Sequence, residues 1–151
     1  MEIRIQSHRE LPGLKKREIK AKLAKVLSDL GCHDKELSVL FTDDRRISEL
    51  NLQYMGRTGP TNVLAFPMAD PGTSGQPYDF ITELLGDVVI SVDTAQREAG
   101  EYGESLEQTI DRLLIHGILH LLGHDHIGSE EQAVLMEKEE ERLMALVGGG
   151  K

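Results

Sequence analysis

The chain has 151 residues, a length typical of one domain, and we expect residues 1–151 to form a single domain with a frayed tail at 148–151. Its net charge of −9 argues against a protein that binds nucleic acid over its whole surface, because such binding depends on Lys and Arg. One cysteine excludes an internal disulfide, no apolar run reaches the roughly 18–20 residues that span a bilayer, and no apolar signal core follows Met1, so we expect a cytoplasmic protein without a membrane partner.

The N-terminal part of the sequence predicts a strand followed by a helix. Residues 1–6 place isoleucines at alternate positions, which is typical of an edge strand. Apolar residues then recur at helical spacing over 14–30. Gly31 is a natural end for this helix, because glycine readily adopts the left-handed conformation.

A second strand and a short helix follow. Residues 36–42 (ELSVLFT) have the composition of a strand. Either Asp43 or Asp44 is expected to cap a helix that runs to about Tyr54, because short carboxylates accept hydrogen bonds from the first turn. The next residues, MGRTGPTN at 55–62, contain the glycines and proline of a loop.

Two more predicted strands flank a long irregular segment. The apolar runs 63–66 and 84–92 both predict strands. Between them, residues 67–82 contain three Pro and two Gly and predict a loop. A short helix is expected at about 93–99.

Two longer helices complete the chain. The first is expected over about 105–122, where Ser105 and Gln108 have the spacing of a capping box. The second is expected over about 130–146. Four strands and about five helices predict an α+β fold, in which one small mixed sheet packs against the helices.

Four of the six histidines lie in the segment HGILHLLGHDH. His116 and His120 are four residues apart on a predicted helix, so both imidazoles lie on one face. Gly123 allows the chain to turn back and bring His126 to the same ion. Imidazole ligands favour Zn²⁺ or another divalent transition metal over Mg²⁺ or Ca²⁺. The sequence therefore predicts one zinc ion at the end of this central helix, held by His116, His120 and His126.

The predicted metal site is open. Three protein ligands leave a fourth tetrahedral position for water, and such sites are typically catalytic in hydrolysis. The spacing resembles that of metzincin metalloproteases, but Gly117 stands where they have their general-base glutamate, which argues against their mechanism. His124 has three open interpretations: a ligand in place of His126, a hydrogen-bond donor to the site, or a surface residue.

Three segments together resemble the YbeY family of bacterial metal-dependent endoribonucleases. They are HGILHLLGHDH at 116–126, NLQYMGRTGPTNVLAF at 51–66 and LLGDVVIS at 84–91, and the resemblance covers about residues 35–145. It implies a small α+β fold with zinc held by three histidines. It also implies cleavage of single-stranded RNA, in maturation of the small-subunit ribosomal RNA 3′ end and in ribosome quality control.

Two departures from the family pattern bear on the chemistry. The family usually has Arg directly after the Tyr of the second segment, where it is thought to contact RNA or serve catalysis, whereas this chain has Met55. Arg57 is the nearest cation, and it either reaches the same cleft or is an exposed loop residue. Ala65 stands where Ser is common. The candidate catalytic residues are therefore His116, Arg57 and Asp125. For Asp125, however, we favour two other interpretations, in which it orients a ligand histidine or caps a turn.

Other candidate contacts to RNA are sparse. Three Tyr, three Phe and no Trp make a stacking platform for several bases unexpected. The basic segment 14–25 is the best candidate for a phosphate track, although it is equally a docking face for a ribosomal or assembly protein, or a solvated helix face like the acidic segment 130–141. Thr61 and Asn62 are either cleft or turn residues, and Asp87 is expected to have a structural role.

Three functions compete on these observations. The favoured one is a metal-dependent endoribonuclease. A different zinc hydrolase is the second, although Gly117 argues against its peptidase form. The third is a ribosome-assembly or binding factor with a mainly structural metal, which Met55 keeps open. Removing the metal separates the third from the others, because a structural site then loses its fold.

Overall fold

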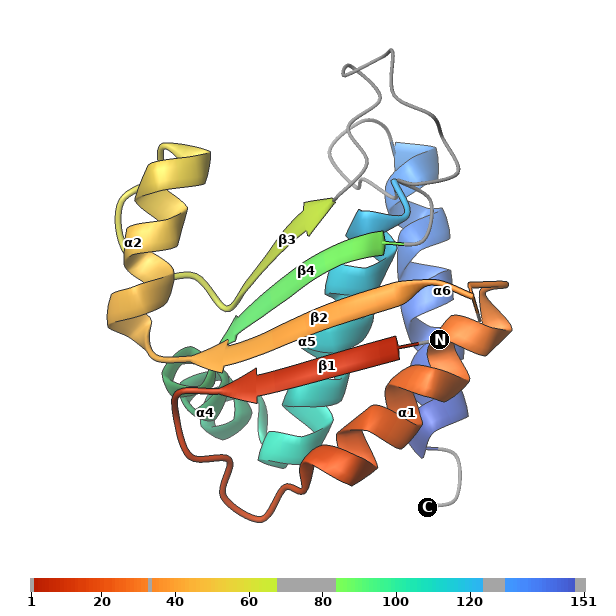
Figure 1. Ribbon diagram of the computed structural model, residues 1–151, viewed down its shortest axis with the longest axis horizontal. Helices are drawn as coiled ribbons and strands as arrows, with labels where there is room; N and C mark the ends of the chain where they lie inside the picture. The colour runs from red at the N-terminus through yellow and green to blue at the C-terminus, as the bar shows by residue number, and fades with distance from the viewer. Residues whose placement is uncertain (1, 33, 68–83, 124–129, 149–151) are drawn as a thin grey trace.

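The computed structural model describes residues 2–32, 34–67, 84–123 and 130–148. Within these ranges it contains four strands and five helices, as predicted (Figure 1). The elements are β1 (Glu2–Ser7), α1 (Lys16–Asp29), β2 (Glu36–Thr42), α2 (Asp44–Met55), β3 (Val63–Pro67), β4 (Leu84–Ser91), α4 (Val92–Tyr102), α5 (Leu106–Leu121) and α6 (Glu130–Gly148). None of the helices in these ranges is long and apolar enough to cross a membrane.

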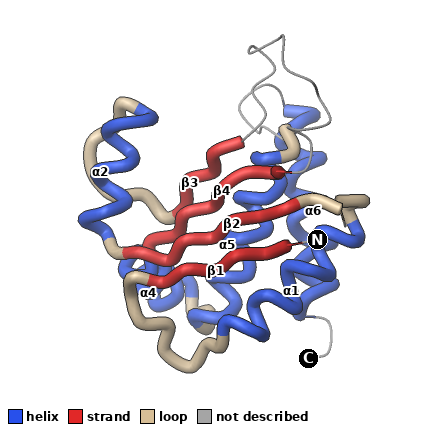
Figure 2. The backbone as a smooth tube through the Cα atoms, in the orientation of Figure 1, coloured by secondary structure: helices blue, strands red, loops and turns tan. Residues whose placement is uncertain are grey.

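The strands form one mixed sheet in the order β1-β2-β4-β3 (Figure 2). β1, β2 and β4 run parallel, and β3 pairs antiparallel with β4. β1 lies at one edge, which confirms the prediction for the N-terminal strand. The α+β class with a small mixed sheet is therefore confirmed.

The two faces of the sheet pack against different helices. Val88 of β4 is fully buried in the main apolar core, which includes residues of α1, α4, α5 and α6. The next residue, Val89, points to the opposite face and packs with Ile47 of α2 and Leu64 of β3 in a smaller cluster. α5 and α2 therefore lie on opposite faces of the sheet.

The helix predicted over 93–99 is longer in the structure. It begins at Val92 because the hydroxyl of Ser91 accepts a hydrogen bond from the backbone N–H of Thr94 at 3.2 Å. It continues past Gly100 and ends at Gly103, which has a φ of 66°. Of Gly100 and Gly103, only Gly103 adopts the left-handed conformation that ends a helix.

Two other predicted boundaries, at Pro67 and Gly148, differ from the structure, and the segments beyond them lie outside the described residues. Pro67 was expected in the loop but is the last residue of β3, where a sheet edge tolerates a residue without an N–H group. The rest of the predicted loop, 68–82, lies outside the described residues. Gly148 was expected in the frayed tail but ends α6, and 149–151 lie outside the described residues.

Two adjacent aspartates fix the start of α2. Asp43 is the cap, because its side chain accepts from the backbone N–H of Arg46 at 2.9 Å. The carboxylate of Asp44 accepts hydrogen bonds from the hydroxyls of Ser91 and Thr94, both at 2.6 Å, and pairs with Arg97 at 2.9 Å. Burial alone would raise the pKa of Asp44, but these hydrogen bonds and the Arg97 charge hold it below its ordinary value.

Replacing Asp44 with Ala is expected to lower the free energy of unfolding by about 2–3 kcal/mol at pH 7, because several hydrogen bonds to one carboxylate are lost. The folded-state pKa of Asp44 is depressed, so its contribution is present above the unfolded-state pKa of about 4 and is lost as pH falls through the folded-state value. Urea unfolding of both proteins at pH 7 and at pH 3 measures this. A difference in stability that is unchanged at pH 3 would contradict the role of the charge.

Candidate metal centre

α5 carries the candidate metal ligands, and both of its ends are fixed by its own sequence. At the start, the hydroxyl of Ser105 accepts from the backbone N–H of Gln108 at 3.1 Å, and the Gln108 side chain accepts from the Ser105 N–H at 3.0 Å. The predicted capping box is confirmed. After the helix ends, Gly123 has a φ of 94° and donates its N–H to the carbonyl of His120 at 3.0 Å. The chain turns at this glycine, as predicted.

His116 and His120 converge on one point beside α5. Their Nε2 atoms are 3.1 Å apart, and their rings are 4.6 Å apart at an angle of 65°. Both residues are half-buried, whereas the helix residues between them are buried. The pair therefore opens on a surface, which a ligand can reach.

The spacing of the two nitrogens fits a shared metal ion. Zn–N bonds are about 2.0–2.1 Å long, so two nitrogens in a tetrahedral site are separated by about 3.3 Å. The observed Nε2–Nε2 separation of 3.1 Å is close to that value. The donor set of imidazole nitrogens also suits zinc or a neighbouring transition metal.

A carboxylate from α6 lies behind the first histidine. Oε2 of Glu140 is 3.4 Å from Nδ1 of His116, and both side chains are largely shielded from solvent. A proton on Nδ1 would point toward Glu140, while Nε2 faces His120. Carboxylates in this position orient metal-ligating histidines. The sequence analysis missed Glu140, because it treated the acidic segment of α6 as a solvated face.

Replacing Glu140 with Ala is expected to weaken zinc binding about 10- to 100-fold, since the orienting partner of His116 is lost. Glu137→Ala removes the same charge from an exposed position of the same helix and is expected to leave zinc affinity unchanged. Competition with a chromogenic chelator measures both dissociation constants. Equal affinities in the two variants would show that Glu140 has no such role.

Close packing of α5 on β4 explains why position 117 is a glycine, which the sequence did not reveal. A Cβ atom at this position would lie 2.8 Å and 3.1 Å from the two Cγ atoms of Val88. α5 therefore approaches β4 too closely for any side chain here. The position that holds the general base in metalloproteases faces the core of this protein, which adds a structural argument against their mechanism.

Three residues of the histidine segment lie outside the described residues: His124, Asp125 and His126. Within the ranges that the structure describes, no group of three or more His, Cys, Asp or Glu side chains is arranged to hold a metal. The third ligand and the roles of His124 and Asp125 therefore stay predictions.

Arg57 lies in the exposed segment between α2 and β3, where its backbone N–H donates to the carbonyl of Asn51 at 3.3 Å. Among the described residues, its guanidinium forms no hydrogen bond or ion pair. α2 packs on the sheet face opposite α5, so this part of the structure does not bring Arg57 into contact with the histidine pair. Its catalytic role stays a prediction.

Arg112 is a cation that the sequence analysis missed. It lies one helical turn before His116, and the spacing of four residues could have revealed it. Its guanidinium pairs with Glu104 at 3.1 Å and with Glu98 at 3.7 Å. With Asn62 these residues line a cavity of about 410 Å³. Because two carboxylates offset its charge, Arg112 is a poor candidate for binding phosphate.

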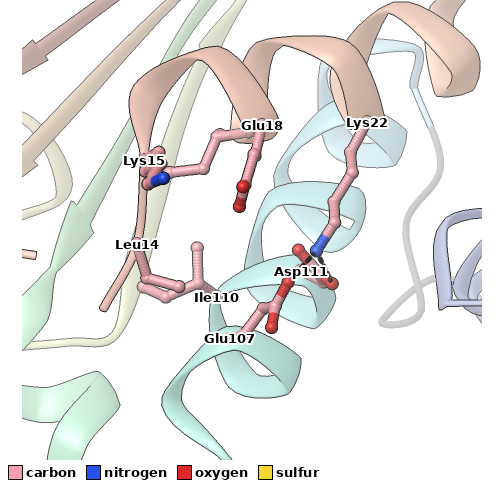
Figure 3. Close-up of a pocket in the computed structure, with 8 residues that line it drawn as sticks. Leu14, Lys15, Glu18, Lys22, Glu107, Ile110 and Asp111 are labelled. Atoms are coloured by element: carbon pink, nitrogen blue, oxygen red, sulfur yellow. Dashed lines mark hydrogen bonds and ion pairs between the residues drawn. The ribbon is translucent and has the colours of Figure 1, made fainter. Parts of the chain in front are cut away.

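One residue of the predicted phosphate track on α1, Lys22, is engaged in ion pairs and is not available to phosphate. Nζ of Lys22 donates to Glu107 at 2.6 Å and to Asp111 at 2.9 Å, both on α5 (Figure 3). Burial alone would lower the pKa of Lys22, but these two hydrogen bonds outweigh it and raise the pKa. Lys22 therefore joins α1 to α5 and does not face solvent as the prediction required. The basic residues that remain exposed in this part of the chain are Lys15, Lys16, Arg17, Lys20 and Lys25.

The other candidate residues fall on different parts of the fold. Asn62 joins β4 and α4: its backbone carbonyl accepts from the backbone N–H of Ser91 at 3.0 Å, and its side-chain amide donates to Glu98 at 3.0 Å beside the cavity. Thr61 is half-buried next to it. Asp87 was expected to be structural, but its carboxylate has no hydrogen bond or ion pair to any described residue.

Comparisons with known proteins agree over nearly the whole chain. The family model described as "Endoribonuclease YbeY" matches residues 3–148. Endoribonuclease YbeY of Syntrophus aciditrophicus is 37% identical over 150 residues, which covers 99% of this chain and 91% of that protein. The Aquifex aeolicus relative is 48% identical over 140 residues, covering 89% of each.

A solved structure supports the same assignment. The solution structure of a Thermotoga maritima protein has a TM-score of 0.66 and 26% identity, and the match covers 98% of this chain and 90% of that one. The family match extends from β1 into α6, so it includes the sheet and the histidine-bearing helix. The chain therefore belongs to the endoribonuclease YbeY family.

Proposed function

We propose that this protein is a zinc-dependent endoribonuclease that cuts single-stranded RNA. It acts in the cytoplasm on ribosomal RNA, at the 3′ end of the small-subunit RNA and in ribosome quality control. The observation that carries the proposal is the pair of Nε2 atoms of His116 and His120, 3.1 Å apart, within a chain that matches the endoribonuclease YbeY family over residues 3–148.

The donor set supports a metal-dependent enzyme of this family, and zinc is the ion that fits it best. Nε2 of His116 and of His120 would hold the ion together with His126. When bound, zinc supplies Lewis-acid stabilisation of phosphate charge and lowers the pKa of a coordinated water. Glu140 keeps the His116 ring in the orientation that presents Nε2.

The described part of α5 offers no carboxylate that could act as a general base beside the histidines. Gly117 stands at the position where metalloproteases have one, and Asp111 and Glu107 are engaged with Lys22. His124 and Asp125, which lie beside His126 in the sequence, are the candidates for this role within the proposal. Arg57 is the candidate for a cation that contacts phosphate, since Arg donates two parallel hydrogen bonds to such groups.

The proposal is tested by cutting of a single-stranded ribosomal RNA fragment. Wild type, His116→Ala and Arg57→Ala are compared, and the zinc content of each sample is measured. We expect wild type to cut, His116→Ala to lose both zinc and cutting, and Arg57→Ala to keep zinc but cut more slowly. The exposed Arg45→Ala on α2, outside the candidate phosphate track, is the matched control for loss of a surface arginine.

One result would replace the nuclease with the assembly-factor function. If wild type carries one zinc ion per chain and cuts no better than His116→Ala, hydrolysis of RNA is not its activity. The presence of Met55 where the family usually has Arg would then support the assembly-factor function. Binding to ribosomal subunits would become the next measurement.

A further inference from the structure

A groove crosses the face of the sheet that points away from α5, and its floor is built from paired rows of strand residues. Ser38 of β2 and Phe66 of β3 both pair with Asp87 of β4, one on each side. In the next row, Leu40 pairs with Val89. The floor therefore mixes the polar side chains of Ser38 and Asp87 with the apolar side chains of Phe66, Leu40 and Val89.

One side of α2 forms the wall of this groove. Arg46, Leu50 and Tyr54 follow one another at intervals of four residues, so they share a helix face. These three residues and the floor enclose a volume of about 470 Å³. That size is within the usual range of about 300–1,000 Å³ for small-molecule sites, and the mixture of apolar walls with a few polar groups is typical of them.

Two features at one end of the groove fit a nucleobase. Tyr54 is 59% exposed, and its ring and that of Phe66 form a T-shaped pair with centroids 5.4 Å apart, so much of the Tyr54 side chain stays open for stacking. The half-buried carboxylate of Asp87 has no hydrogen bond or ion pair within the described ranges. This carboxylate can therefore accept hydrogen bonds from a ligand that enters the groove.

The carboxylate also discriminates among bases. An ionised Asp has two acceptor oxygens and no donor. Guanine presents two adjacent N–H donors on its pairing edge, the ring N1–H and the exocyclic amine, and can satisfy both oxygens. Adenine and cytosine present one amine beside an acceptor, and uracil presents one N–H between two carbonyls. Guanine is therefore the base that matches Asp87 best.

The polar end of the groove adjoins the helix that carries the histidines. Gly86 precedes Asp87, and a Cβ there would lie 2.9 Å from the side chain of Leu121, the residue after His120. It would also lie 2.4 Å from the carbonyl oxygen of Phe66. α5 thus ends against the start of β4, next to the row of the sheet that holds Asp87.

We propose that the groove binds one base of the RNA strand next to the cut, with Tyr54 stacking on it and Asp87 selecting guanine. The inference rests on the proposed function for the identity of the ligand. It gives the enzyme a sequence preference on the sheet face opposite the helix that carries His116 and His120.

The test is equilibrium binding of four labelled RNA heptamers, UUUXUUU with X as G, A, C or U, by fluorescence anisotropy at 4 °C. Gel analysis after each titration ensures that only uncut RNA is scored. We expect wild type to bind the G heptamer at least about fivefold more tightly than the U heptamer. Asp87→Asn is expected to bring that ratio to about one, whereas Glu101→Gln, which removes the same charge from an exposed position of α4, preserves it.

Tyr54 is tested on the same heptamers. Tyr54→Ala is expected to weaken binding of all four about tenfold, because stacking is tolerant of base identity, and Tyr54→Phe is expected to retain wild-type affinity. Thermal unfolding of each variant shows that the groove is intact. Equal binding of the four heptamers by wild type, or a guanine preference that survives in Asp87→Asn, overturns the proposal.

Cutting assays on the same samples separate the two proposals. If the protein prefers guanine through Asp87 but cuts no RNA, the groove proposal is supported and the nuclease proposal is refuted. Cutting that is unaffected by Asp87→Asn and Tyr54→Ala, in a protein that binds all heptamers equally, would refute the groove and leave the nuclease standing.

Discussion

Replacing Gly117 with Glu, which writes the metalloprotease motif HExxH into α5, is expected to destabilise the protein by more than about 4 kcal/mol and to create no peptidase. The added side chain would meet Val88 at 2.8 Å from its first carbon atom onward. Val88 is fully buried in the main core, so its side chain has no free space to move into. The carboxylate would also enter an apolar core, where burying a charge is costly.

A glycine on another helix provides the control for this change. Gly100 lies in α4, is exposed, and has no atom within 4 Å of its Cβ position. Gly100→Glu is expected to be neutral or to stabilise by up to about 1 kcal/mol, because Glu favours helix more than Gly does. Urea unfolding of the two variants measures the difference. A Gly117→Glu protein as stable as Gly100→Glu would show that α5 can move away from the sheet.

The elements of this fold were predictable because their signals are local. The capping box of Ser105 and Gln108 and the left-handed turn at Gly123 depend on residues within one helical turn, and both occur as predicted. The helix pattern over 14–30 likewise located α1 to within two residues at its start and one at its end. Boundaries failed where two local signals competed, as with Gly100 and Gly103.

The surroundings of the site were not predictable, because they come from contacts between distant parts of the chain. Glu140 is 24 residues from His116 in sequence, and nothing in an acidic helix marks which carboxylate will face a histidine. Lys22 lies 85 residues from Glu107 and was treated as exposed for the same reason. Asp87 is unusual only because its neighbours in the sheet leave its carboxylate without a partner. These contacts depend on how the helices pack on the sheet, which the periodicity of one sequence does not specify.

Removal of the metal is expected to abolish RNA cutting while the protein stays folded. The described core consists of apolar residues from the sheet and four helices, and neither His116 nor His120 belongs to it. The hydrophobic effect of such a core holds a chain of this size without a metal. Metal still stabilises the native state by mass action, by about 4 kcal/mol when free zinc is a thousandfold above its dissociation constant.

This coupling predicts a Tm about 8–16 °C lower after chelation, since each kcal/mol shifts the Tm of a protein of this size by about 2–4 °C. Calorimetry with and without chelator measures the shift, and His120→Ala in zinc is expected to melt at the same temperature as the chelated wild type. Restoring zinc to the chelated wild type should recover both Tm and cutting, whereas His120→Ala should recover neither. Loss of the cooperative transition on chelation would instead show that the metal holds the fold, and the metal would then be structural, as the assembly-factor function requires.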